Sequence, residues 1–202
     1  PQDVAAPEVA RPDCRRTGIP ACPHPHFLCR NAISAGHTIR YHLSNSVILP
    51  RMTRQKILIT GASSGLGAGM ARQFAAKGRD LALCARRAEN LEELKAELTA
   101  TYPSITVAVA ALDVNDHEAV PKIFQELSEE LGGIDTVIVN AGIGKGYPIG
   151  GGKPWHNIAT IETNLVSALV QIETAKAMFK AAGRGHLVLV SSVLGNKGVP
   201  GV

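Results

Sequence analysis

This sequence contains one glycine-rich stretch between two regular patterns, Thr60-Gly61-Ala62-Ser63-Ser64-Gly65-Leu66-Gly67. The apolar run 56–60 before it predicts a buried strand, and the pattern 66–77 after it predicts a helix. Glycines allow a tight turn and let a ligand approach the backbone closely. A helix N-terminus at this point offers N–H groups and partial positive charge to a pyrophosphate. The predicted nucleotide-binding residues of this turn are Gly61, Ser63, Ser64, Gly65, Leu66 and Gly67.

Apolar runs alternate with helical patterns over the following residues. Further strands are predicted at 81–84, 105–109, 134–139 and 187–190. Helices are predicted at 91–98, at 120–131 with Pro121 in a late-starting first turn, and from Pro154 to near Gly183. Continuously apolar strands separated by helices indicate a parallel sheet covered on both faces. The predicted fold class is therefore α/β, a Rossmann-like doubly wound parallel sheet.

The charge of the chain is concentrated near its beginning. The 202 residues carry a net charge of +4, and residues 1–51 hold six arginines against three acids. Residues 52–202 hold 15 basic and 14 acidic residues, so they are almost neutral and give little support to nucleic-acid binding. With 45% hydrophobic residues, a wholly disordered chain is excluded. No apolar run approaches the roughly 18 residues that span a bilayer.

Residues 1–51 have a composition of their own, rich in proline and without helical or strand periodicity. Cys22, His24, His26 and Cys29 are residue types that bind zinc, but their spacing fits no structural zinc pattern, so no metal site is predicted. We expect this segment to be disordered, or a prefix that is not native to the protein. The predicted organisation is thus a prefix at 1–51 and a partial nucleotide-binding domain at 52–202.

Two arginines follow the second predicted strand. A site for NAD usually has an acid there to bind the ribose hydroxyls, whereas this chain has Arg86 and Arg87. Two guanidinium groups suit a ribose 2′-phosphate. The alternative is that both are solvated surface arginines. The missing acid favours NADP(H) over NAD as the cofactor.

These motifs occur in an order that resembles the short-chain dehydrogenase/reductase family over residues 53–202. Thr60-Gly61-x-x-x-Gly65-x-Gly67 is similar to the cofactor turn of that family. Asp113-Val114 resembles the pair that contacts adenine. Asn140-Ala141-Gly142 resembles the motif that supports the sheet near the cofactor. Asn164 resembles the catalytic asparagine that holds a proton-relay water, and Ser192, in Ser191-Ser192, resembles the catalytic serine.

The resemblance implies hydride transfer between the nicotinamide and a carbonyl or alcohol carbon. It also implies a tyrosine that passes the proton and a lysine that lowers the pKa of that tyrosine. In the family pattern these fall at roughly positions 205 and 209, beyond Val202. Tyr147 and Lys153 do not match the pattern. We therefore expect the 202 residues alone to be inactive and poorly soluble, with two of about seven family strands missing and an apolar strand edge exposed.

The functional prediction is an NADP-dependent oxidoreductase acting on a small carbonyl or alcohol substrate. The alternative is a nucleotide-binding regulatory module without hydride chemistry. A Tyr-x-x-x-Lys pair following residue 202 would favour the enzyme. The resemblance further implies a homodimer or homotetramer for the full-length form. We expect a cytoplasmic protein that binds neither membrane nor nucleic acid.

Overall fold

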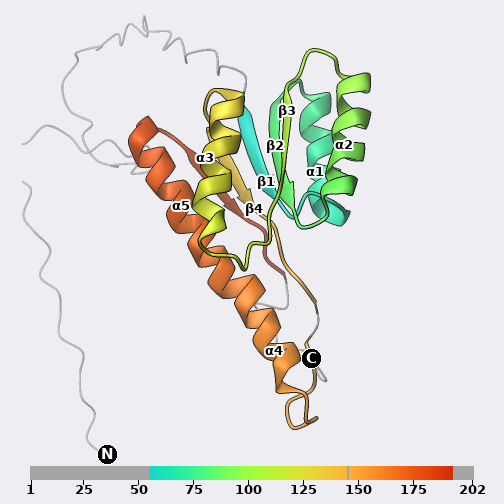
Figure 1. Ribbon diagram of the computed structural model, residues 1–202, viewed down its shortest axis with the longest axis vertical. Helices are drawn as coiled ribbons and strands as arrows, with labels where there is room; N and C mark the ends of the chain where they lie inside the picture. Colours follow the sequence, from blue (N-terminus) through green and yellow to red (C-terminus); the bar gives the residue numbers. More distant parts are fainter. Residues whose placement is uncertain (1–54, 145, 193–202) are drawn as a thin grey trace, which may run out of the picture. The chain divides into compact units, whose positions relative to one another are not determined.

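The computed structural model describes residues 55–144 and 146–192, and these contain a five-stranded sheet (Figure 1). In spatial order the strands run β3-β2-β1-β4-β5, and all neighbours are parallel. Their bounds are β1 (Lys56–Thr60), β2 (Asp80–Ala85), β3 (Val107–Ala111), β4 (Thr136–Val139) and β5 (His186–Leu189). The winding direction reverses between β1 and β4. The predicted Rossmann-like doubly wound sheet is confirmed, and such a reversal leaves a crevice at the carboxyl ends of the strands.

Helices cover both faces of this sheet. In Figure 1, α1 and α2 lie on one side of the strands, and α3 and α5 lie on the other. The helices are α1 (Gly65–Ala76), α2 (Ala88–Thr101), α3 (Ala119–Leu131), α4 (Pro154–Ile161) and α5 (Ser167–Ala182), with a π-helical turn η1 (Glu162–Val166) between the last two. Two layers of crossover helices let β1, β2 and β4 bury both of their faces, whereas the edge strand β5 contains no buried residue.

The core is divided in two by the sheet, because successive strand residues point to opposite faces. Ile57 and Ile59 of β1 pack in one cluster with α1 and α2. Leu58 packs in the other, with the fully buried Phe124 of α3. The cluster under α1 uses small residues on the helix, namely Ala68, Ala71 and Ala75. These alanines let α1 approach the sheet closely, which holds the glycine-rich turn against the end of β1.

The element boundaries differ from the predicted ones in one informative place. β3 begins at Val107, two residues later than expected. The Asp80 carboxylate accepts the Thr106 N–H at 2.8 Å, and the Ile105 N–H bonds back to Tyr102 O at 3.1 Å. The N–H groups of Ile105 and Thr106 are thus bonded to a local turn and to a side chain, so they do not pair with the neighbouring strand.

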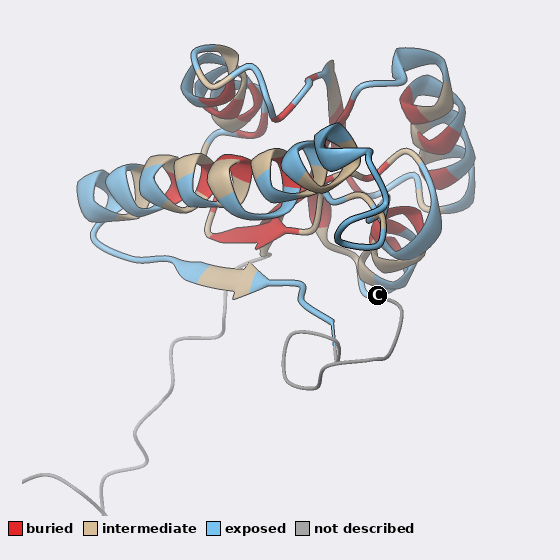
Figure 2. Ribbon diagram, turned by 90° about the horizontal axis from the view of Figure 1, so that it is seen from below, coloured by how far each residue is buried: buried red, intermediate tan, exposed pale blue. Residues whose placement is uncertain are grey.

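The first part of the apolar stripe of the long helix does not face the core, whereas Ile172 and Phe179 further along pack against it. Figure 2 shows the outer side of this helix exposed along its length. Ile158, Ile161, Leu165 and Leu169 are each more than half exposed. The buried positions of η1 and α5 are instead small or polar, and they are Thr163, Ser167, Gln171 and Ala175. Hydrophobic spacing predicted the helix correctly, although it does not show which face meets the sheet.

The Cys84 thiol on β2 is fully buried, and this burial raises its pKa to about 12. A thiol with a raised pKa stays protonated at pH 8, and the thiolate is the reactive form. We expect Cys84 to resist alkylation by iodoacetamide at pH 8 in the folded chain and to react fully in denaturant. Mass spectrometry that resolves each cysteine checks this. Labelling of Cys84 under native conditions as fast as in denaturant would contradict it.

Candidate nucleotide-binding site

A cleft of about 250 Å³ lies at the carboxyl ends of the strands. It is lined by four segments: the glycine-rich turn, the end of β2, the loop after β3 and the loop after β4, with one residue of η1. The lining residues are Gly61, Ser63, Ser64, Ala85, Arg86, Arg87, Leu112, Asp113, Val114, Asn115, Ala141, Gly142, Ile143 and Thr163. The cleft therefore sits at the point where the winding reverses, where ligands bind to such sheets.

The glycine-rich turn has the geometry that its sequence predicts. Gly61 and Gly65 have φ of 67° and 56°, a region that residues with a Cβ rarely adopt. Ser64 is the N-cap of α1, but its side chain makes no capping hydrogen bond. The N–H groups of the first helical turn are thus not satisfied by a cap. They can serve an anion at the positive end of the helix dipole.

Thr60 and Asn140 join the ends of β1 and β4 behind the cleft. The buried Thr60 Oγ1 accepts the N–H groups of Asn140 and Ala141, each at 3.1 Å. The Asn140 side chain donates to Thr60 O at 2.9 Å. Asn140 itself does not line the cleft. The Asn140 side chain instead stabilises the backbone from which Ala141 and Gly142 line the cleft.

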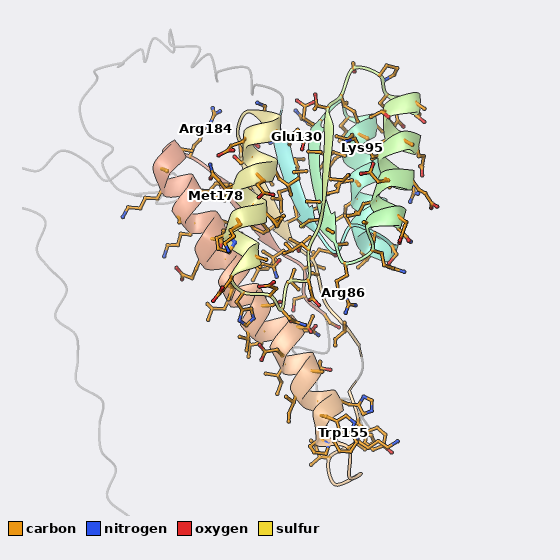
Figure 3. All side chains as sticks on the ribbon, in the orientation of Figure 1. Arg86, Lys95, Glu130, Trp155, Met178 and Arg184 are labelled. Carbon is orange, nitrogen blue, oxygen red and sulfur yellow. The ribbon has the colours of Figure 1, made fainter. Side chains whose placement is uncertain are left out.

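The end of β2 supplies the positive charge of the cleft. Arg87 Nη2 donates to Ser64 Oγ at 2.8 Å and to Ser63 Oγ at 3.2 Å. Arg86 is exposed, and its side chain extends beyond the end of the sheet in Figure 3. One arginine is therefore held against the glycine-rich turn while the other is exposed at the cleft. Charge-assisted bonds from such guanidiniums suit a phosphate group.

The loop after β3 lines the cleft next to the end of β2, its neighbouring strand. Asp113 Oδ1 accepts the Asn115 N–H at 3.0 Å, which makes a local turn after the strand. Val114 is buried, so its side chain fixes the loop to the core. The two residues predicted to contact adenine, Asp113 and Val114, both line the cleft, and so does Asn115, which the sequence did not single out.

Asn164 lies in the π-helical turn, and its side chain holds the loop after β4. Its Oδ1 accepts the Ile143 N–H at 2.8 Å, and its Nδ2 donates to Ile143 O at 2.8 Å. Both ends of the amide are engaged by one residue, so the observed role of this side chain is to position the loop. Asn164 does not itself line the cleft.

The other predicted site residues lie at the same end of the sheet. Ser192 follows β5 and is exposed, and it is not among the lining residues. Gly65, Leu66 and Gly67 belong to the first turn of α1 and lie outside the lining as well. The candidate zinc ligands at 22–29 fall outside the described residues. Over the described residues, no group of three or more metal-binding side chains gathers.

Sequence patterns did not identify five of the lining residues: Ala85, Leu112, Asn115, Ile143 and Thr163. Ala85 and Leu112 adjoin predicted motifs at strand ends, so their positions could have been inferred. The position of Thr163 could not have been inferred, because Thr163 lines the cleft from a π-helical turn that no local sequence pattern predicts. Within the described residues, no helix is long and apolar enough to cross a membrane.

Comparison with known proteins gives a consistent result. The sequence profile of the short chain dehydrogenase family matches residues 55–202. An uncharacterized oxidoreductase of Mycobacterium tuberculosis is 75% identical over 155 residues, which is 77% of this chain and 61% of that protein. The chain thus spans about three fifths of the length of this curated relative.

Solved structures agree with this match. Levodione reductase is 32% identical with a TM-score of 0.69, over 73% of this chain and 57% of that one. An alcohol dehydrogenase from Thermococcus sibiricus, solved with 5-hydroxy-NADP, is 29% identical with a TM-score of 0.69, over 73% of this chain and 62% of that one. Both chains extend well beyond the part that this chain matches.

Proposed function

The chain belongs to the short chain dehydrogenase family, and we propose that the protein is an oxidoreductase that transfers a hydride between NADP(H) and a carbonyl or alcohol carbon. The observation that carries this proposal is the cleft at the winding reversal. It combines an uncapped helix N-terminus, two arginines and a loop that resembles the adenine-contacting one. The oxidoreductase names of relatives support the reaction class.

The residues present fit NADP(H) better than NAD(H). The position after β2 that usually carries an acid for the ribose hydroxyls is occupied by Arg86 and Arg87. The Ser63 and Ser64 hydroxyls lie beside Arg87 and can donate to a 2′-phosphate. The relative solved with 5-hydroxy-NADP is consistent with this preference. When bound, the nicotinamide ring supplies or accepts the hydride.

We assign the remaining roles to this chain's own side chains as follows. Ser192 hydrogen-bonds the substrate oxygen, and Asn164 holds the loop after β4 in place at the nicotinamide end. The sequence of 202 residues contains no Tyr-x-x-x-Lys pair. The proton step therefore has no assigned residue here, and we propose that these 202 residues alone bind the nucleotide without turning it over.

We also propose that the full-length protein is a homodimer or homotetramer. The exposed apolar face of the long helix, formed by Ile158, Ile161, Leu165 and Leu169, supports association, because contiguous apolar surface of this kind marks interaction sites. The substrate is a small molecule, and no membrane or nucleic-acid partner is proposed. Cys84, the cysteine in the described residues, is a free thiol, which is consistent with a cytoplasmic location.

Two adjacent serines allow a matched test of the reaction. In the whole protein, Ser192→Ala should lower kcat by about 100-fold or more with a carbonyl substrate, as loss of a group aiding proton transfer does. Ser191→Ala should leave kcat within about two-fold, because a side chain away from the reacting atoms contributes little. NADPH consumption with a panel of ketones and aldehydes provides the measurement. Nucleotide binding without turnover of any carbonyl or alcohol would favour the regulatory module instead.

A further inference from the structure

Two consecutive residues of η1 tie the long helix to two different walls of the cleft. Thr163 Oγ1 accepts a hydrogen bond from Asn115 Nδ2 at 3.1 Å, in the loop after β3. Asn164 makes its two bonds to Ile143, in the loop after β4. In the proposed function the first loop contacts the adenosine end of the cofactor, and the second leads to its nicotinamide end. The helix thus bridges the two ends of the site.

The π-helical turn makes this double contact possible. Successive residues of a helix point about 100° apart, so neighbours reach separate loops only at a particular rotation of the helix. A π turn inserts a residue by closing i to i+5 hydrogen bonds, and such turns are frequent at functional sites. Replacing η1 with a regular α turn would rotate Thr163 and Asn164 away from one or both loops.

The contact to the loop after β3 is sheltered and reinforced. Thr163 is only 6% exposed, so loss of its hydroxyl bond would leave a buried polar group without a partner. One residue earlier, Glu162 Oε1 lies 3.4 Å from His117 Nε2 of the same loop, and the two form an ion pair only when the imidazole is protonated. The tight fit continues on the other side, where a Cβ on Gly142 would come 3.2 Å from Asn164 Oδ1. The rotation of η1 is therefore constrained from both loops.

We propose that Asn115 and Thr163 are positioning residues that couple the adenosine end of the cleft to the loop after β4. Ordering of the loop after β3 by the adenine ring of a bound adenosine 2′-phosphate strengthens the Asn115–Thr163 bond. That bond fixes η1, and η1 holds Asn164 on Ile143. The identity of the ligand in this coupling rests on the proposed function. The positioning of the loop after β4 by Thr163 is independent of that function.

The coupling requires that η1 exists in two states, and that contacts at both ends of the site change the balance between them. In the ordered state both bonds of η1 are made. In the other state η1 is displaced and the Ile143 N–H is open to exchange with water. The exchange rate of this single amide therefore reports the state of η1. Because Ile143 also lines the cleft, comparison with Thr163→Val separates the coupling from a direct contact of the nucleotide.

The first arm of the test uses the whole protein without ligand, with amide exchange followed by NMR. Thr163→Val keeps the shape of the side chain and removes the hydroxyl. We expect it to speed exchange of Ile143 by about five-fold, the factor that one net hydrogen bond contributes. Thr163→Ser, which keeps the hydroxyl, should restore the wild-type rate. Thr174→Val, which removes a hydroxyl bonded only to Val170 O on α5, should leave it unchanged.

The core amide of Leu83 on β2 separates positioning from general destabilisation. If Ile143 and Leu83 speed up together in Thr163→Val, the residue serves stability only and the proposal fails. It fails equally if Ile143 keeps its wild-type rate, or if Thr163→Ser behaves as Thr163→Val does. A double-mutant cycle with Asn115→Ala should show strong non-additivity at Ile143, because both substitutions remove the same bond. Additive effects would overturn the pairing.

The second arm adds adenosine 2′-monophosphate as the probe. We expect it to slow exchange of Ile143 in the wild-type chain and not in Thr163→Val. Equal slowing in both, or binding that shifts Val114 without slowing Ile143, would refute the coupling. Absence of any binding would count against the proposed cofactor instead, and the first arm would still decide whether Thr163 positions the loop.

Discussion

Gly67→Ala is expected to unfold the glycine-rich turn locally and to abolish binding of NADPH. A Cβ at this buried position would overlap the carbonyl oxygen of Gly61 and lie 2.9 Å from both Ala62 Cα and Asn140 Nδ2. Two of these three atoms belong to backbone, which cannot move aside as a flexible side chain can. Overpacking of this kind costs roughly 3 kcal/mol.

The same helix contains a matched control. Gly69 is also helical, and a Cβ there would meet nothing within 4 Å. Gly69→Ala should therefore raise the free energy of unfolding by about 0.5 to 1 kcal/mol, because alanine is the better helix former. Urea denaturation gives the two stabilities, and fluorescence titration gives NADPH binding. If Gly67→Ala bound NADPH as tightly as Gly69→Ala, the close approach of α1 to β1 would not matter for the site.

The contrast between these glycines shows what local patterns can predict. The glycine-rich turn, the strand before it and the helix after it follow from residue types at short spacing. The glycines of the turn predicted a tight turn, and the structure adds that Gly61 and Gly65 adopt positive φ angles there. The motif includes Gly67 and leaves out Gly69, but the physical reason, a clash of a Cβ with Gly61, Ala62 and Asn140, depends on residues that meet in space, and Asn140 is far away in sequence.

The long helix shows where pattern reading ends. Its apolar spacing predicts a helix, yet the side that packs inward carries Thr163, Ser167 and Gln171. Ser167 Oγ donates to Thr163 O, and Gln171 Nε2 donates to Ser167 O, so much of the polarity of this face is satisfied within the helix itself. Binary patterning assigns polar residues to solvent. It therefore could not predict this face, nor the Asn115–Thr163 bond that spans 48 positions.

Replacing both Arg86 and Arg87 with glutamine is expected to weaken binding of NADPH by about 100-fold and binding of NADH by less than about three-fold. The reason is that only the 2′-phosphate of NADPH makes charge-assisted bonds to the two arginines. Isothermal titration at fixed salt gives both dissociation constants. Arg79→Gln removes one positive charge at the opposite end of β2, so it controls for long-range electrostatics in each single variant. Equal losses for the two nucleotides would remove the argument for a 2′-phosphate site.

The single variants should differ, because the two side chains differ in their contacts. Arg86 is exposed, and no partner for it is found among the described residues, so Arg86→Gln should weaken NADPH alone. Arg87 also holds Ser63 and Ser64 of the glycine-rich turn, at 3.2 and 2.8 Å. Arg87→Gln should therefore loosen the turn and weaken NADH measurably as well. If the two single variants lost NADPH and NADH affinity in the same ratio, the hydrogen bonds from Arg87 to the serines would break when the nucleotide binds. Both guanidinium groups would then bind the 2′-phosphate.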